Sequence, residues 1–214
     1  MELVPAEPSN EHDASLLVTY ANVAEERDAI GVHDGRMPHI EALIGRMQGD
    51  EADRLLEVGG GTGNTAAVFA AAGLNVVMTD LSPDQVMLAR QKGLTASAAD
   101  IRELPFDDAS FDAVWAENCL LHIANRDMPD ALSEIRRVLV PDGLFVLTLW
   151  GGIDSEGIYE DDFYRPRRFF SLRSDDSLRN LVEETFEVES FECPFDRESD
   201  DRLHLQVLYL RPRT

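Results

Sequence analysis

Residues 55–64 read LLEVGGGTGN, in which strand-favouring positions lead into three consecutive glycines and a fourth two residues later. The run TAAVFAAA at 65–72 follows directly and favours a helix. A strand, a glycine turn and a helix in this order build a nucleotide-binding crevice at the carboxyl end of a parallel strand. Glycine suits such a turn because it lacks a Cβ atom, so it allows positive φ and lets a ligand lie against the backbone.

The rest of the chain continues the alternation of strands and helices. The hydrophobic patterns predict helices at 64–72, 82–92, 128–139 and 174–185, and strands at 54–58, 74–79, 94–99, 111–116 and 144–150. Strands joined by helical crossovers form a parallel sheet with helices on both faces. Residues 186–193 and 203–210 alternate apolar and polar residues, which predicts an antiparallel pair at the sheet edge. We therefore expect an α/β, Rossmann-like fold with a seven-stranded, mostly parallel sheet and an antiparallel C-terminal edge pair.

A chain of 214 residues favours one domain. The acidic segment 1–13 is expected to be a disordered tail, and 14–214 a single domain. Within that domain we expect an N-terminal helical cap at 14–50, a ligand-binding core at 53–150, and a substrate lid at 151–173, which looks irregular and rich in charged and aromatic residues.

The net charge of −22 argues against nucleic acid as a partner, because an acidic surface repels phosphates. No apolar run is long enough for a membrane span, and the N-terminus lacks the pattern of a signal peptide. Cys119 and Cys193 read as buried thiols of a cytoplasmic protein. The five histidines and two cysteines show no metal-ligand spacing, so no metal site is expected.

Three kinds of glycine loop are considered for residues 57–64. A phosphate-binding Walker loop would end in Gly-Lys-Ser or Gly-Lys-Thr, which is absent. The dinucleotide pattern G-x-G-x-x-G fails at its last position, which is Asn64. The pattern E-x-G-x-G-x-G is matched in full from Glu57 to Gly63.

Three further motifs follow in order. Asp80 ends the second predicted strand, where a carboxylate can accept the hydroxyl hydrogens of a ribose. Asp100-Ile101 follows the third strand and precedes LPFDDASFD at 104–112. RRVLVPDGL at 136–144 leads into the fifth strand. With these motifs, residues 55–150 resemble the class I S-adenosylmethionine-dependent methyltransferases, and most closely the small type 11 group.

The resemblance implies a cofactor site for S-adenosylmethionine, with S-adenosylhomocysteine as product. Asp80 is expected at the ribose and Asp100 with Ile101 at the adenine, although Asp80 also fits a helix cap. The expected cofactor-binding residues are Tyr20, Arg27, Glu57, Gly59, Gly61, Gly63, Asp80, Leu81, Asp100, Ile101 and Ala116. Arg36 is an alternative to Arg27 as the partner of the cofactor carboxylate.

Candidates for catalysis and acceptor binding are less constrained by the motifs. Glu117 and His122 follow the fourth strand and are the candidate catalytic residues; histidine titrates near neutral pH and so can act as a base. The expected substrate-binding residues are Asn118, Tyr159, Tyr164 and Arg168. The alternative interpretation of Arg168 is an arginine cluster neutralised by neighbouring acidic residues.

The function implied is methyl transfer to nitrogen or oxygen of a small-molecule or peptide acceptor, by a monomer or homodimer. Two alternatives stay open, a tRNA or RNA base methyltransferase, which the net charge opposes, and a non-catalytic S-adenosylmethionine-binding module. An NAD-dependent oxidoreductase is a weaker alternative, because the dinucleotide pattern is incomplete.

Overall fold

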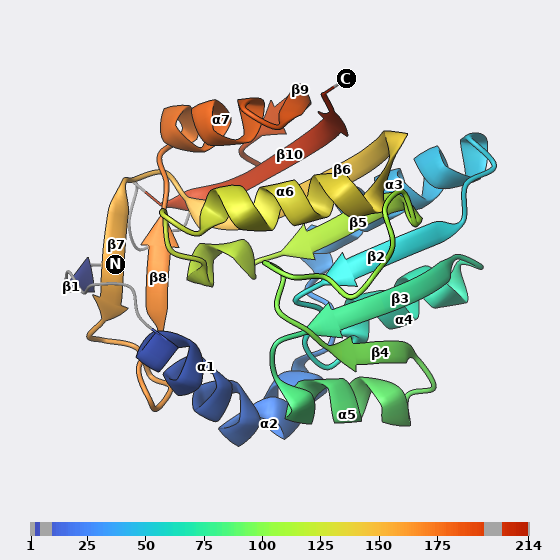
Figure 1. Cartoon of the computed structure of the whole chain (residues 1–214). Helices are drawn as coiled ribbons and strands as arrows, with labels where there is room; N and C mark the ends of the chain where they lie inside the picture. Colours follow the sequence, from blue (N-terminus) through green and yellow to red (C-terminus); the bar gives the residue numbers. More distant parts are fainter. Residues whose placement is uncertain (1–2, 5–9, 195–202, 214) are drawn as a thin grey trace.

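The computed structural model describes residues 3–4, 10–194 and 203–213, which form two sheets (Figure 1). The large sheet has the strand order β4-β3-β2-β5-β6-β10-β9. Strands β4, β3, β2, β5 and β6 run parallel to one another, and β10 is antiparallel to both β6 and β9. The predicted α/β sheet with an antiparallel edge pair is thereby confirmed. Its strands are β2 (Arg54–Val58), β3 (Asn75–Asp80), β4 (Thr95–Ala98), β5 (Phe111–Glu117), β6 (Leu139–Gly151), β9 (Phe186–Glu192) and β10 (His204–Pro212).

Helices cover both faces of this sheet. In Figure 1, α6 (Met128–Val138) lies in front of the strands and α3 (Met37–Gly49) behind them. The front core contains Leu132 and Ile135 of α6 and also residues of α7 (Asp175–Glu183). The opposite core contains Ile40 and Leu43 of α3, and it also receives residues of α4 (Asn64–Ala71) and α5 (Pro83–Gln91). Two apolar cores, one on each face, therefore hold the strand ends in place.

Two helix starts follow from the sequence in a simple way. The Ser82 hydroxyl accepts a hydrogen bond from the Gln85 amide at 3.4 Å, and Pro83 opens α5. The Ser174 hydroxyl accepts one from the Ser177 amide at 3.3 Å and begins α7. A serine at this position satisfies an amide that the first helical turn leaves without a partner.

The segment expected as a substrate lid is more regular than predicted. It contains β7 (Ser155–Tyr159) and β8 (Phe169–Leu172), and β1 (Leu3–Val4) pairs with β7 to complete a three-stranded antiparallel sheet. The expected tail at 1–13 thus includes a short strand and, from Asn10, the start of a helix. Strand β7 escaped prediction because Glu156 and Gly157 interrupt its apolar pattern, and β8 because it has only four residues. Strand β1 gains its pairing from β7, far along the chain.

The N-terminal cap also differs in detail from the prediction. The helical cap expected at 14–50 begins earlier, at Asn10, and consists of α1 (Asn10–Asn22), α2 (Ala24–Ile30), η1 (Asp34–Arg36) and α3. Strand β6 begins before its predicted start because Leu139 pairs with Phe111 across a shift in register.

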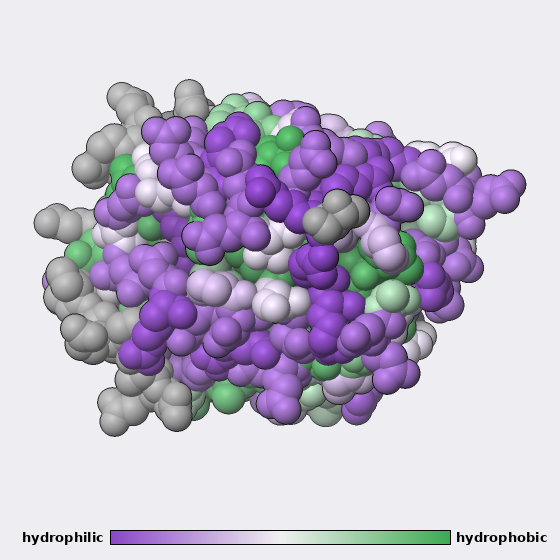
Figure 2. Space-filling model, turned by 45° about the horizontal axis from the view of Figure 1, so that its top comes forward, coloured by the Kyte–Doolittle hydropathy of each residue, from purple (hydrophilic) through white to green (hydrophobic). Residues whose placement is uncertain are grey.

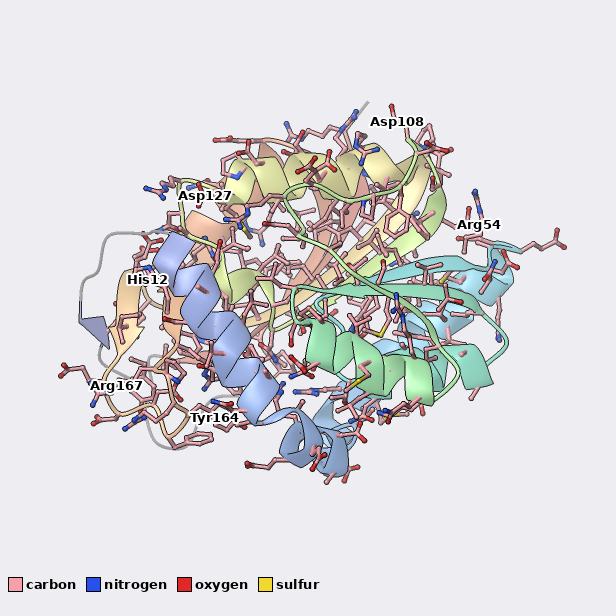
Figure 3. All side chains as sticks on the ribbon, turned by 60° about the horizontal axis from the view of Figure 1, so that its bottom comes forward. His12, Arg54, Asp108, Asp127, Tyr164 and Arg167 are labelled. Carbon is pink, nitrogen blue, oxygen red and sulfur yellow. The ribbon has the colours of Figure 1, made fainter. Side chains whose placement is uncertain are left out.

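Helix α1 lies between the small sheet and α5, at the carboxyl ends of the parallel strands (Figures 1 and 3). The Thr19 hydroxyl donates to the Pro166 carbonyl oxygen at 2.6 Å. The side-chain amide of Asn22 donates to the Arg165 carbonyl oxygen at 3.3 Å. These bonds attach the end of α1 to the loop between β7 and β8. Helix α1 therefore closes over the strand ends as part of the cap.

The face shown in Figure 2 is mostly hydrophilic, with scattered apolar patches. This agrees with the net charge of −22. Among the helices that the structure describes, none combines the length and the apolar character that crossing a bilayer requires.

Candidate functional site

A cavity opens at the carboxyl ends of β2, β3, β4 and β5, beneath α1, and encloses about 870 Å³ including its mouth. The ends of parallel strands are where ligands bind in open α/β sheets. The cavity gathers most of the residues that the sequence selected. The predicted residues in its wall are Tyr20, Arg27, Gly59, Gly61, Asp80, Leu81, Asp100, Ile101, Glu117, Asn118 and His122.

The glycine turn has the backbone that its sequence predicts. Gly59, Gly61 and Gly63 have φ values of +64°, +59° and +79°, a region that other residues rarely adopt. A Cβ atom on Gly59 would lie 2.2 Å from the Cβ atom of Cys119, which follows β5. Two loops of the cavity wall therefore touch at Gly59, and only glycine fits there.

Asp80 is held rigidly at the end of β3. Its Oδ2 atom accepts a hydrogen bond from the Gly61 amide and its Oδ1 atom one from the Ser82 amide, both at 2.8 Å. Burial raises the pKa of Asp80, while the two amides and the nearby Arg27 oppose this rise. The carboxylate is thus oriented before any ligand arrives, with its remaining lone pairs available at the cavity wall.

Asp100 and Ile101 line the cavity beyond β4. The Asp100 Oδ1 atom accepts a hydrogen bond from the Arg102 amide at 2.9 Å, and the Arg102 guanidinium donates to Asp13 of α1 at 2.7 Å. Arg102 therefore links the cap to the loop after β4. The sequence analysis missed Arg102, although its place two residues after the acidic motif is a usable signal.

Gln85 is a second residue that the sequence analysis missed. It lies in the cavity wall, and its Nε2 atom donates to the Tyr20 carbonyl oxygen at 3.1 Å. Its Oε1 atom is buried without a hydrogen-bond partner among the described residues. An unpartnered buried acceptor in a cavity wall is suited to a ligand that can donate a hydrogen bond.

His122 links the cavity to both the cap and the small sheet. Its Nδ1 atom lies 2.8 Å from the Phe169 carbonyl oxygen and must carry hydrogen, because a carbonyl can only accept. Its Nε2 atom therefore accepts the hydrogen bond from the Tyr20 hydroxyl, at 2.8 Å. Burial lowers the pKa of His122 to about 3, so the ring is neutral at physiological pH. This histidine connects α1 to β8.

Glu117 stands at the end of β5 and forms a close ion pair with Arg36 of η1. Burial raises the pKa of Glu117, and the Arg36 charge is the largest influence in the other direction. Glu117 and Asn118 also line a second cavity, on the α3 side of the sheet, which encloses about 740 Å³ including its mouth. These two residues are therefore a wall common to both cavities.

Asn118 owes its position to an unusual backbone conformation. Its φ is +50°, its amide donates to the Thr148 carbonyl oxygen at 2.8 Å, and its Oδ1 atom accepts from the Trp150 amide at 3.2 Å. These bonds fix the ends of β5 and β6 side by side beside the common wall.

Several predicted residues lie outside the first cavity's wall. Gly63 and Ala116 belong to the flanking turn and strand, and Glu57 is buried, with its pKa raised well above the usual value mainly by burial. The predicted substrate residues Tyr159, Tyr164 and Arg168 line neither this cavity nor the second one.

Arg168 instead forms a two-point ion pair with the fully buried Asp162, at 2.8 and 3.0 Å. The Tyr164 ring lies against its guanidinium, with 4.6 Å from the Cζ atom to the ring centroid. In Figure 3, Tyr164 lies near the end of α1, on the loop that follows β7. For Arg168, the arrangement matches the alternative interpretation, in which a neighbouring acidic residue neutralises it.

One group of possible metal ligands occurs among the described residues, although the sequence predicted no metal site. Asp175, Cys193 and His204 have ligand atoms within 4.8 Å of one another. The Asp175 Oδ1 atom already accepts from Gln206 at 2.7 Å and lies 2.8 Å from the His204 Nε2 atom. The pairing of β9 with β10 brings Cys193 and His204 together, which their sequence spacing did not reveal.

Comparison with known proteins agrees with the geometry. Residues 56–147 match the model of the type 11 methyltransferase domain. Over 120 residues the chain is 38% identical to 27-O-demethylrifamycin SV methyltransferase of Amycolatopsis mediterranei, which covers 50% of this chain and 42% of that protein. The chain spans less than half the length of the first curated relatives it matches.

Two solved structures show the same fold over nearly the whole chain. The 1,6-didemethyltoxoflavin-N1-methyltransferase of Burkholderia thailandensis, with bound 1,6-didemethyltoxoflavin and S-adenosylhomocysteine, has a TM-score of 0.77 and 21% identity, covering 99% of this chain and 94% of that chain. The [4+2]-cyclase SpnF has a TM-score of 0.72 and 19% identity, covering 100% of both chains. Residues 56–147 thus match the type 11 methyltransferase domain, and the chain as a whole has the fold of an S-adenosylmethionine-dependent methyltransferase.

The residues present fit S-adenosylmethionine as the cofactor. The wall offers a carboxylate at Asp80, a glycine turn that leaves backbone uncovered, apolar side chains at Leu81 and Ile101, and the unpartnered acceptor of Gln85. A nucleoside with hydroxyl and amino donors and a flat base requires this combination of groups.

Proposed function

We propose that the protein transfers a methyl group from S-adenosylmethionine to a nitrogen or oxygen atom of a small molecule. The observation that carries the proposal is the gathering of the glycine turn, Asp80 and Asp100 in one cavity. The names of the relative from Amycolatopsis and of the structural neighbour from Burkholderia describe methyltransferases that act on small molecules. The net charge of −22 disfavours an RNA acceptor.

When bound, S-adenosylmethionine supplies a methyl carbon on a positively charged sulfur; the acceptor lone pair bonds to this carbon as the carbon–sulfur bond breaks, its electrons stay on sulfur, and the acceptor releases a proton. The chain would hold the ribose at Asp80 and the adenine beside Asp100 and Ile101. Cap helix α1 shields the reacting groups from water, and holding the reactants in line provides much of the rate enhancement.

Of the two candidate bases, Glu117 suits the role better than His122. The His122 lone pair on Nε2 already accepts from the Tyr20 hydroxyl, and a pKa of about 3 makes the ring a weak base. Glu117 borders both cavities, and burial raises the pKa of its carboxylate, which makes it a stronger base. We infer that Glu117 accepts or orients the hydrogen of the acceptor and that His122 positions the cap.

The test combines cofactor binding with a transfer assay. Calorimetry with S-adenosylhomocysteine on the full chain is expected to show one site, and tritiated S-adenosylmethionine is expected to label a pool of small metabolites. Peptide and RNA pools are run in parallel. Labelling of RNA alone would overturn the small-molecule proposal.

Binding without transfer to any pool would favour the non-catalytic module. This outcome is tested separately because the fold is not confined to methyltransferases. The structural neighbour SpnF, which has the same fold, is named a [4+2]-cyclase. Failure of S-adenosylhomocysteine to bind would contradict the proposal at its first step.

A further inference from the structure

We propose that the second cavity binds the methyl acceptor, and that this acceptor is a flat aromatic molecule carrying an amino or hydroxyl group. The inference rests on the proposed function and adds to it the class of substrate. None of the sequence motifs predicted the aromatic wall of this cavity.

The body of the second cavity is aromatic. Its wall contains both tryptophans of the chain, Trp115 and Trp150, the imidazoles of His33 and His39, and the apolar side chain of Leu205. Trp115 is fully buried, and its ring packs edge-on against Phe69, with 5.5 Å between the centroids, so this wall is rigid. Rigid flat rings favour a flat partner, because aromatic surfaces stack at a small loss of conformational entropy.

One end of the cavity is polar. Glu117 and Arg36 form an ion pair there, with Asn118 and Thr148 beside them. The Trp115 indole N–H faces the Glu117 carboxylate and helps lower the pKa of Glu117. The contact falls short of strict hydrogen-bond geometry, and the indole N–H has no other partner among the described residues. A carboxylate fixed in this way can accept a hydrogen bond from an N–H or O–H group.

The polar end is also the end that faces the cofactor cavity. Glu117 and Asn118 belong to both walls, so an acceptor that donates a hydrogen bond to Glu117 places its nitrogen or oxygen at the boundary between the cavities. The aromatic body of the acceptor then extends away from the cofactor, between Trp150 and His39. The proton that leaves the acceptor atom during transfer passes to the Glu117 carboxylate.

The two indole groups provide a direct readout of occupancy. Because both tryptophans line the second cavity, each of the two indole N–H signals in a nitrogen-15 NMR spectrum reports on it. The protein is first saturated with S-adenosylhomocysteine and then titrated with 6-aminoquinoline. Cyclohexylamine, an amine without an aromatic ring, is titrated as the matched probe. We expect 6-aminoquinoline to shift both signals and to bind at least about tenfold more tightly than cyclohexylamine.

The variant Trp150→Leu keeps an apolar wall but removes its flat ring, and it is expected to weaken 6-aminoquinoline binding about tenfold in calorimetry. The matched control is Phe163→Leu, the same aromatic-to-aliphatic change at a residue that is 75% exposed and lines neither cavity. Both variants are expected to bind S-adenosylhomocysteine within twofold of the unaltered protein.

The proposal is overturned if 6-aminoquinoline fails to bind, displaces S-adenosylhomocysteine, or binds without shifting the indole signals. The proposal is also overturned if Trp150→Leu binds 6-aminoquinoline as tightly as the unaltered protein does. If Trp150→Leu does not fold, the indole shifts of the unaltered protein decide the matter. Loss of S-adenosylhomocysteine binding by the unaltered protein would instead contradict the proposed function, so the two failures are distinguishable.

Discussion

The Asp80 carboxylate and the Gly61 amide are joined by a hydrogen bond of 2.8 Å, which ties the end of β3 to the glycine turn after β2. The glycine turn and the Asp80 carboxylate therefore hold each other in position, although they follow different strands. A ligand that uses Asp80 benefits from a carboxylate already fixed by Gly61 and Ser82.

The variant Asp80→Asn is expected to bind S-adenosylhomocysteine at least about tenfold more weakly, because an amide offers one acceptor atom where the carboxylate offers two. Calorimetry at neutral pH measures the change. The control is Asp84→Asn, at an exposed aspartate in the first turn of α5. Equal affinities of the two variants would show that Asp80 does not contact the ligand.

The contact between Gly59 and Cys119 predicts an intolerant position. The variant Gly59→Ala is expected to lose about 3 kcal/mol or more of unfolding free energy, because its Cβ atom would overlap the Cys119 side chain. Gly93→Ala is the control, because Gly93 also has positive φ, at +83°, but has open space around its Cβ position. It is expected to lose only about 1–2 kcal/mol. Urea denaturation of both variants measures the difference, and equal losses would contradict the steric argument.

The neutral His122 predicts a loss of stability in acid. In the unfolded chain a histidine binds a proton near pH 6.5, whereas in the fold it does so only near pH 3. Protons therefore favour the unfolded chain as the pH falls through this window. The loss of unfolding free energy is expected to reach at most about 2 kcal/mol at pH 5, as the ring is only partly buried.

His122→Gln lacks this titration, so its stability is expected to change less between pH 7 and pH 5 than that of the unaltered protein. The control is His33→Gln, at an exposed histidine. Denaturant unfolding at a series of pH values measures the slopes. Parallel slopes for His122→Gln and the unaltered protein would contradict the assignment of a neutral ring.

The buried pair of Asp162 and Arg168 predicts a strong coupling. Arg168→Met leaves a carboxylate with 0% exposure without its partner and is expected to cost about 3 kcal/mol or more. Adding Asp162→Asn removes the unpaired charge and is expected to recover part of that loss. Arg126→Met is the exposed control and should change stability by less than about 0.5 kcal/mol. No recovery in the double variant would contradict the pairing.

The sequence predicted the order of the central strands and helices because each one carries a local signal. Serines begin α5 and α7, apolar runs mark β2 and β6, and the glycines mark the turn between β2 and α4. Asp80 and Asp100 could be placed at the site because the carboxyl ends of parallel strands share one sheet edge.

What the sequence did not predict depends on contacts between distant segments. The small sheet needs β1 to meet β7, and the second cavity needs η1, β5, β6 and β10 to meet at one place. Arg168 was expected at the substrate, but the loop folds back so that Asp162 neutralises it. No pattern within one segment predicts contacts between distant segments. Sequence analysis therefore identified the cofactor class but not the acceptor.

Lys92 gives the N-terminal cap one more property. It is the single lysine of the chain, and its ammonium group contacts Asp28 of α2, the Thr62 carbonyl oxygen at 2.9 Å and the Asn64 side chain. The cap, the glycine turn and the start of α4 therefore meet at the only amine-bearing side chain. An amine-reactive reagent applied to the folded protein can thus serve as a footprint of this junction, with slow labelling of Lys92 marking a closed cap and fast labelling an open one.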